Sequence, residues 1–338
     1  MDYEVIVFMS DLPVVSVIVP VFNAAKSLRA SVDSLLKQSL TGLEIILVND
    51  ASTDQSGLII DNLAADYPHI LAVHLKQNLG AHEARLEGLR RSSAPWIGFL
   101  DADDYARTDM YARLYGTATA QDVDIVLCGS NLVSADRKVL ATKVSFSSPK
   151  RVEERLFERF CTFDLGTGAL WNKLFRRELI EPFFFLNLPW RQRLNEDFIL
   201  NLACFSRARS IFLLPDSLHE YASYGQGVTA RLPPALAYVE TYRACAAALN
   251  ALKGLTEEQR GWVIQAYRIQ FSWPECVISN HRELKSYGPE LAEAANLLAA
   301  VDPASLAGLS ARLSPPRGRV RAALEAILRF IGVRPSLL

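Results

Sequence analysis

Three carboxylates lie within four consecutive positions, Asp101, Asp103 and Asp104, directly after the short apolar run WIGFL. Carboxylates this close repel one another, and each raises the pKa of its neighbours. A divalent cation relieves the repulsion, and hard oxygen ligands favour Mg²⁺ or Mn²⁺. Because Mg²⁺ usually keeps only one or two protein carboxylates beside phosphates and water, this D-x-D segment fits a nucleotide–metal site. The alternative is a solvated acidic turn before the helix expected after Thr108.

Other candidate binding residues follow the ends of other apolar runs. Asp50 comes directly after LEIILVN, where a carboxylate can accept a hydrogen bond from a nucleobase or a ribose hydroxyl. Its alternative role is a helix N-cap. Pro20, Phe22 and Asn23 end the first run, and Phe22 either stacks on a base or packs in the core. Arg85, in the helix expected after Gly80, either faces the crevice at the strand ends or is a solvent-exposed helix arginine.

Two further segments carry candidate groups. Glu196 and Asp197 open an apolar helical stretch, where the helix macrodipole stabilises an acidic pair. The functional alternative for Asp197 is a general base. Trp171 is a candidate sugar-stacking wall and Lys173 a candidate phosphate contact, but a core tryptophan and a surface lysine explain them equally well.

The elements that must position these residues are predicted from hydrophobic patterning. Short β-branched runs predict buried parallel strands at 14–20, 43–49, 70–75, 96–100 and 123–128. Helical periodicity lies between them, and Ser52 with Gln55 predicts a capping box at the start of one helix. The alternation predicts an α/β fold with a doubly wound, mostly parallel, Rossmann-like sheet. Ligands bind at the carboxyl ends of such strands, so the polar groups should converge.

Composition and missing motifs exclude several classes of protein. The 338 residues carry 36 Lys+Arg against 37 Asp+Glu, which argues against a polybasic nucleic-acid binder. Neither G-x-G-x-x-G nor G-x-x-x-x-G-K-[ST] occurs, which disfavours a dinucleotide site and a P-loop. The five cysteines are widely spaced and odd in number, as expected for reduced, buried thiols. No basic leader or long apolar run is present, so we expect a cytoplasmic location.

The second half of the chain has a different pattern. Residues 233–300 are rich in Ala and Leu and are predicted to be helical. The last 28 residues, 311–338, contain six arginines and one acid, and 319–331 read as a basic amphipathic helix. Such a helix either lies on an anionic lipid surface or packs its apolar stripe on the rest of the chain.

Three stretches together resemble the inverting family-2 glycosyltransferases with a GT-A fold. They are VSVIVPVFNAAKSLRASVDSLLKQSLTGLEIILVNDASTDQS, NLGAHEARLEGL and WIGFLDADDYARTDM. The resemblance is strong over 14–130 and continues more weakly, through WNKLFRREL and NEDFIL, to about 230. It implies a nucleotide-sugar-binding half at 14–130, an acceptor-binding half at 131–230, and a helical C-terminal region with a basic tail at 231–338.

The resemblance also implies roles for individual residues. Asp103 matches a metal ligand, Asp104 is a second candidate ligand, and Asp197 matches the catalytic base. The residues that match nucleotide-sugar contacts are Pro20, Phe22, Asn23, Asp50, Arg85 and Asp101. The string LHEYA departs from the family pattern, and its His219 is either a late metal ligand or a structural histidine.

The implied activity is metal-dependent sugar transfer with inversion. The donor would be a nucleotide-sugar, usually a UDP-sugar, and the cofactor Mn²⁺ or Mg²⁺. The acceptor would be a saccharide or a lipid-linked saccharide in cell-surface polysaccharide synthesis, which suits the inner face of the membrane. One alternative is a nucleotidyltransferase, although VPVFNAAKS lacks the expected glycine-rich basic loop. The other is a non-catalytic subunit that binds sugar nucleotides.

Overall fold

The computed structural model describes residues 12–222, 232–278 and 281–301. They fall into two compact units whose segments alternate along the chain. We call one the sheet unit, which lies within Met1–Glu154, Leu170–Phe185 and Ala208–Ser223. The other is the helical unit, which lies within Arg155–Ala169, Leu186–Arg207 and Tyr224–Leu338. The functional boundaries predicted near residues 130 and 230 remain predictions.

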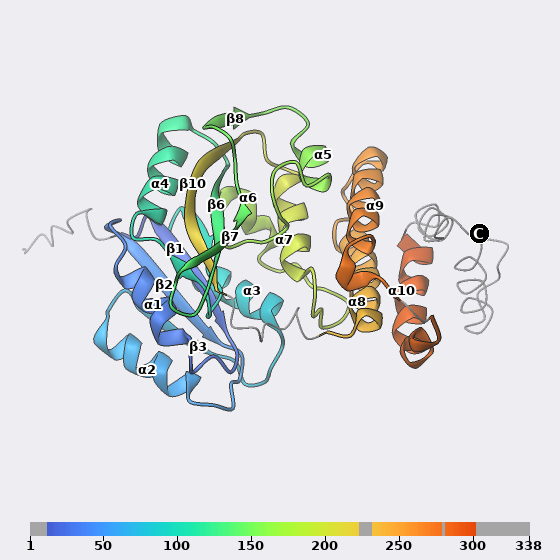
Figure 1. The fold of residues 1–338 in the computed structure, drawn as a ribbon, viewed down its shortest axis with the longest axis horizontal. Helices are drawn as coiled ribbons and strands as arrows, with labels where there is room; N and C mark the ends of the chain where they lie inside the picture. The colour runs from blue at the N-terminus through green and yellow to red at the C-terminus, as the bar shows by residue number, and fades with distance from the viewer. Residues whose placement is uncertain (1–11, 223–231, 279–280, 302–338) are drawn as a thin grey trace, which may run out of the picture. The chain divides into compact units, whose positions relative to one another are not determined.

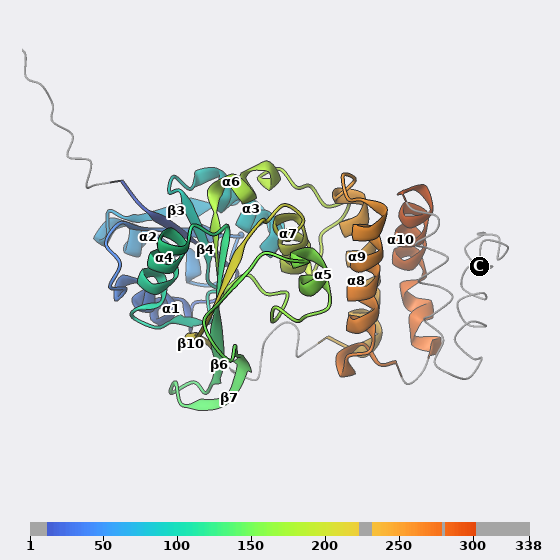
Figure 2. The same ribbon diagram turned by 90° about the horizontal axis from the view of Figure 1, so that it is seen from above.

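The sheet unit is built on one mixed sheet with the strand order β3-β2-β1-β4-β9-β6-β10-β5, with β7 on β6 and β8 on β10 (Figure 1). The strands are β1 (Val15–Val21), β2 (Leu43–Asn49), β3 (Ile70–His74), β4 (Trp96–Phe99), β5 (Tyr105–Ala106), β6 (Ile125–Val133), β7 (Val139–Val144), β8 (Lys150–Val152), β9 (Lys173–Arg176) and β10 (Ile211–Ala222). Strands β1 to β4 pair in parallel, whereas β9 runs antiparallel to its neighbours β4 and β6. The hairpin of β6 and β7 extends beyond the rest of the sheet (Figure 2).

The five predicted strands are present, although only Ile70 of the edge strand β3 is buried, and the sheet is mostly parallel and doubly wound as expected. The chain builds outward from β1 through β2 to β3, then returns to place β4 on the other side of β1. At such a reversal the loops after the two central strands diverge and leave a crevice at their carboxyl ends. The segments after β1 and β4, which carry Phe22 and the aspartate cluster, therefore lie at one edge of the sheet.

Helices cover both faces of the sheet because its strands alternate apolar side chains between the faces. They are α1 (Leu28–Leu36), α2 (Ser56–Asp66), α3 (Ala81–Arg91), α4 (Met110–Gln121) and the short α6 (Arg177–Ile180), which runs into a 3₁₀ turn at Glu181–Phe183. Val17 and Val19 belong to the same core cluster as Val32 of α1. On the opposite face Ile18 lies against Gly88, so α3 approaches β1 at a position without a side chain.

The predicted capping box at Ser52 and Gln55 is wrong. Helix α2 begins at Ser56, and Gln55 is its N-cap without any side-chain hydrogen bond. Instead, the Ser52 hydroxyl accepts a hydrogen bond from the amide of Asn23, at 3.0 Å. A short polar side chain in a loop can serve either the following helix or a neighbouring loop. The tertiary structure selects the neighbouring loop.

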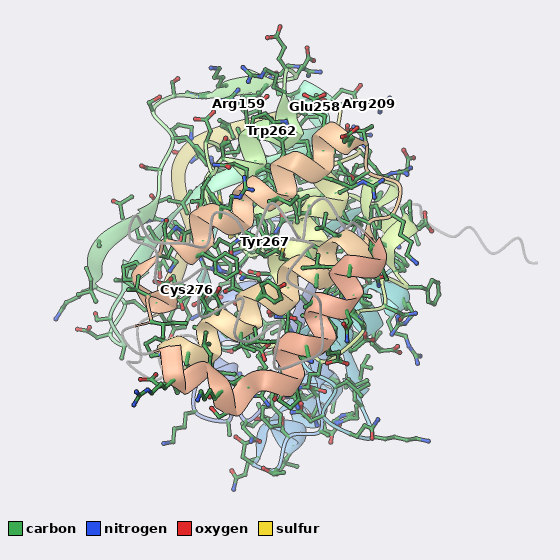
Figure 3. The ribbon with its side chains drawn as sticks, turned by 90° about the vertical axis from the view of Figure 1, so that its right-hand side faces the viewer. Arg159, Arg209, Glu258, Trp262, Tyr267 and Cys276 are labelled. Carbon is green, nitrogen blue, oxygen red and sulfur yellow. The ribbon has the colours of Figure 1, made fainter. Side chains whose placement is uncertain are left out.

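The helical unit confirms the helices predicted within 233–300. It contains α5 (Leu156–Cys161), α7 (Glu196–Phe205), α8 (Pro234–Ala251), α9 (Glu257–Phe271) and α10 (Gly288–Val301), with 3₁₀ turns at Pro274–Cys276 and His281–Tyr287. Helix α8 packs against both α9 and α10 (Figure 1). Tyr267 of α9 lies among these helices (Figure 3), where its ring meets Phe198 of α7 edge-on.

Two further expectations can be compared with the structure. All five cysteines are buried and free of disulfides, as predicted. Within the described part of the chain, no helix is long and apolar enough to cross a membrane. The basic helix predicted at 319–331 lies outside the described residues.

Candidate active site

The loops after β1 and β2 are bonded to each other at the sheet edge. Asn23 has a left-handed backbone, with φ of 50°, which turns its side chain towards the second loop. Its Oδ1 accepts a hydrogen bond from the amide of Thr53, at 2.8 Å. Phe22, beside it, is 48% exposed, so the alternative of a core-packed phenylalanine is wrong. Pro20 lies in β1 opposite Val48 and carries the strand into this loop.

Asp50 joins the second loop to the third. Its carboxylate is buried, and its two oxygens accept the amides of Leu79 and Gly80 at 2.7 and 2.8 Å. These charge-assisted bonds hold the segment from which α3 starts. Asp50 therefore fixes backbone in this structure, and its contact with a nucleobase stays a prediction.

Arg85 and Asp101 form an ion pair across the same edge. Arg85 Nη2 lies 3.0 Å from Asp101 Oδ1, and the arginine side chain is buried. A solvated helix arginine is therefore the wrong alternative. Because Arg85 comes from α3 and Asp101 follows β4, the pair brings two of the predicted site residues together. The backbone oxygen of Asp101 also accepts a hydrogen bond from Ser31 of α1, at 3.2 Å.

Asp103 and Asp104, the other two carboxylates of the aspartate cluster, repel each other and Asp101, with little positive charge nearby to offset the repulsion. Burial, together with the charges of Asp104 and Asp101, raises the pKa of Asp103 to about 7. Burial and the charge of Asp101 also raise the pKa of Asp104, although the amide of Ala222 and the charge of Lys143 oppose the shift. Asp104 Oδ1 accepts that amide at 2.9 Å. The cluster thus stores electrostatic repulsion that a cation would relieve.

His219 lies beneath the cluster and is fully buried. Its Nε2 is 3.3 Å from Asp104 Oδ2, and its Nδ1 is 3.0 Å from the Ser130 hydroxyl. The ring stacks on Trp171, with centroids 4.1 Å apart, and burial lowers the pKa of His219 to about 3. Serine, histidine and aspartate are adjacent here, but the side chains of all three are buried. The arrangement favours the structural alternative for His219.

Trp171 and Lys173 are core residues in this structure. Trp171 is buried against His219, which supports the core alternative for the tryptophan. Lys173 is fully buried in β9, so a surface lysine is wrong, and a phosphate contact is equally contradicted. Its Nζ donates to Asn172 Oδ1 at 3.1 Å.

Asp197 belongs to the helical unit, whereas the other eight predicted site residues belong to the sheet unit. It lies in the first turn of α7, and its Oδ1 accepts the amide of Phe198 at 2.7 Å. Its backbone oxygen accepts a hydrogen bond from Asn201, at 3.1 Å, and the same amide group bonds to Gly168. The carboxylate is therefore carried by a helix end that is itself tied down.

Side chains that follow β2 hold the backbone of the first loop, a role that was not predicted for them. The amide of Ala24 donates to the Ser56 hydroxyl at 2.9 Å, and that of Ala25 donates to Asp54 Oδ2 at 3.0 Å. Although partial burial opposes the shift, hydrogen bonds from Ser56 and Ala25 keep the pKa of Asp54 below its ordinary value. The run ASTDQS after β2 is the available signal, since short polar side chains are suited to bonding nearby backbone.

Comparison with known proteins agrees with this fold. Residues 16–184, half of the chain, match the model of glycosyl transferase family 2. The uncharacterized glycosyltransferase EpsJ of Bacillus subtilis is 33% identical over 225 residues, which cover 64% of this chain and 63% of EpsJ. The cholesterol galactosyltransferase of Borreliella burgdorferi is 30% identical over 206 residues, or 58% of this chain and 56% of that protein. In both cases the match spans less than two thirds of the relative.

The solved structure of S. aureus TarS residues 1–349 in complex with UDP-GlcNAc is similar over 94% of this chain and 90% of that chain. Its TM-score is 0.67 at 21% sequence identity, so the likeness concerns the fold. These observations define a class of protein: a doubly wound α/β sheet with a carboxylate cluster at the edge where its strand order reverses. The chain belongs to glycosyl transferase family 2, and its GT-A fold is confirmed.

Proposed function

We propose that this protein is an inverting, metal-dependent glycosyltransferase that takes its sugar from a UDP-sugar. The acceptor is a saccharide or a lipid-linked saccharide of cell-surface polysaccharide synthesis. One observation carries the proposal. The Arg85–Asp101 ion pair and Asp103, whose pKa is raised to about 7, follow the carboxyl end of β4. The neighbouring strand β1 leads to the exposed Phe22 at the same edge of the sheet. Family membership favours glycosyl transfer over the nucleotidyl transfer considered above. The UDP and UDP-GlcNAc complexes of TarS support a uridine nucleotide as the donor's carrier.

A divalent cation fits the residues at this edge. In the described part of the chain, no three His, Cys, Asp or Glu side chains are grouped so that they alone could hold a metal. Mg²⁺ and Mn²⁺ need only one or two protein carboxylates and fill the remaining positions with water and phosphate oxygens, so we expect the donor phosphates to complete the site. Asp103 would be the first ligand because Arg85 already neutralises Asp101 and because Asp104 is buried against Ala222 and His219. Asp104 remains the candidate for a second ligand.

The proposed reaction is a single in-line displacement at the anomeric carbon. Asp197 removes the proton from the acceptor hydroxyl, and that oxygen bonds to the carbon from the side opposite the diphosphate. The bond to the diphosphate oxygen breaks, and the configuration inverts. Asp103 would hold a divalent cation, which would supply Lewis-acid stabilisation of the charge on the leaving diphosphate. Asp101 holds Arg85, and Asp50 holds the loop before α3, so the binding edge is organised before the donor arrives.

A ligand panel tests the donor. Thermal unfolding is recorded with UDP-, GDP-, CMP- and dTDP-sugars in Mn²⁺ or Mg²⁺, with EDTA as the control. We expect a rise in Tm with UDP-sugars and metal together, and its loss in EDTA. A rise with another nucleotide alone would refute the uridine assignment, and an undiminished rise in EDTA would refute metal dependence.

A matched pair of variants tests the base. Asp197→Asn should reduce release of UDP by about 10²- to 10⁴-fold and leave the Kd for UDP within about twofold. Glu196→Gln, one position away on the same turn of α7, should stay within about threefold of the parent protein. Near-normal turnover by Asp197→Asn would require another base.

The location at an anionic membrane belongs to the same proposal and rests on residues 311–338. Deleting them should reduce co-sedimentation with vesicles that contain phosphatidylglycerol, because the six arginines are removed. Unchanged co-sedimentation would contradict the membrane role.

A further inference from the structure

Helix α8 of the helical unit contains a buried carboxylate, Glu240, which is 2% exposed. A buried carboxylate is costly unless it is paired and hydrogen-bonded. Glu240 Oε2 accepts the backbone amide of Arg193 at 3.1 Å and the side-chain amide of Gln192 at 3.3 Å. Its Oε1 lies 3.5 Å from Arg243 Nη1, one turn further along α8. Both oxygens are therefore occupied.

The partners of Glu240 fix one short segment, residues 190–194, on α8. Gln192 also donates to the backbone oxygens of Glu240 and Leu194, at 2.8 and 2.7 Å. Its own oxygen accepts the indole N–H of Trp190 at 2.9 Å. The Arg243 guanidinium lies over the Trp190 ring, 4.6 Å from its centre. Two residues of α8 thus hold the segment by its backbone and by its side chains.

This segment leads directly into the start of α7, which carries Asp197. Only Asn195, in a left-handed conformation with φ of 64°, stands between Leu194 and the first residue of the helix. A single residue in that conformation leaves little freedom between a fixed segment and a helix. The second turn of α7 is held by a different segment, because the side-chain amide of Asn201 donates to the backbone oxygen of Gly168 at 2.7 Å.

We propose that Glu240 is a positioning residue for Asp197. It anchors 190–194 on α8 and so sets where α7 begins and where the carboxylate of Asp197 points. The inference rests on the proposed role of Asp197 as the base. Nothing in the alanine-rich pattern around Glu240 marks it for function, since the segment that it holds lies about fifty positions earlier in the chain.

Three substitutions separate positioning from simple stability. Glu240→Leu removes every acceptor of the side chain and should lower kcat for UDP release by about 10- to 100-fold, with the donor KM within about twofold. Glu240→Gln keeps an oxygen that can accept the Arg193 amide, and should restore kcat to within about threefold of the parent. Leu298→Ala, a fully buried change on α10, lowers stability without touching the segment and should leave kcat within about twofold.

Hydrogen exchange of the same proteins gives a readout that does not depend on turnover. Backbone amides in 190–199 should exchange at least about tenfold faster in Glu240→Leu than in the parent protein. In Leu298→Ala the exchange rate of the same amides should be unchanged. Unchanged exchange in Glu240→Leu would overturn the proposal, as would a fall in kcat that Leu298→Ala reproduces at equal Tm. Failure of the proposed function appears separately, as a parent protein that turns over no UDP-sugar while the exchange result still holds.

Discussion

Asparagine in place of Asp103 should make the metal-free protein more stable at pH 8. Burial and two neighbouring carboxylates raise the pKa of Asp103 from 3.8 to about 7. Each pH unit of such a change corresponds to about 1.4 kcal/mol, so the ionised group costs at most about 4 kcal/mol. Asp103 is half-buried, and salt screens the repulsion, so we expect about 2 kcal/mol. For a folded unit of this size that is a rise in Tm of about 4–8 °C.

The sign of the pH dependence follows from the raised pKa. In the folded state the carboxyl stays protonated up to about pH 7, whereas the unfolded chain ionises it near 3.8. The parent protein therefore loses stability as the pH rises between those values, and the loss is complete above pH 7. Asparagine does not ionise, so its advantage should be largest at pH 8 and about a quarter as large at pH 4.5.

The assay is thermal unfolding of parent and Asp103→Asn in EDTA at the two pH values, and again with Mn²⁺ at pH 8. Mn²⁺ should raise the Tm of the parent and leave the variant unchanged, since the variant lacks the proposed ligand. A variant less stable than the parent at pH 8 in EDTA would refute the electrostatic argument. Equal gains at the two pH values would refute it as well.

Four further outcomes are expected. Asp50→Ala should cost about 2–4 kcal/mol in urea unfolding, because two backbone amides of the loop before α3 lose a charged acceptor. Gly88→Ala should cost about 1–3 kcal/mol, since its Cβ would collide with Ile18. Gly116→Ala, in α4 with open space around it, should gain about 0.5–1 kcal/mol. Tyr267→Phe should raise stability by about 1 kcal/mol or leave it unchanged, because the buried hydroxyl has no protein partner among the described residues.

Each of these has a contradicting result. A stable Asp50→Ala would mean that water replaces the carboxylate at the loop amides. Equal effects at Gly88 and Gly116 would remove the close approach of α3 to the sheet as a cause. A loss of more than about 1 kcal/mol in Tyr267→Phe would show that its hydroxyl is bonded in solution.

Much of the sheet unit could be predicted because its signals are local. A run such as LEIILVN predicts a strand from its own residues, and the reversal of strand order follows from alternating strands and helices. The placement of Asp101 and Asp103 at a strand end follows in the same way. The ten-stranded sheet did not follow, because β9 and β10 pair with strands far earlier in the chain.

Errors arose where a polar residue had several available partners. Ser52 reads as a helix cap from its spacing to Gln55, yet it bonds Asn23 in another loop. For Arg85 the sequence left open a solvated helix position and a place in the site, and its burial on Asp101 excludes the solvated position. In each case the local pattern is compatible with two environments that only the packing of distant segments distinguishes.

Residue order by itself determines which polar groups stand at strand ends and helix starts, because those positions depend on hydrophobic periodicity over a few residues. The tertiary structure alone decides which of them turn inward. Asp104 and His219 are over a hundred positions apart, and they meet only because β10 lies beside β5 in the sheet. Burial and repulsion there set the charge state of the cluster, since both depend on distances through space and not along the chain.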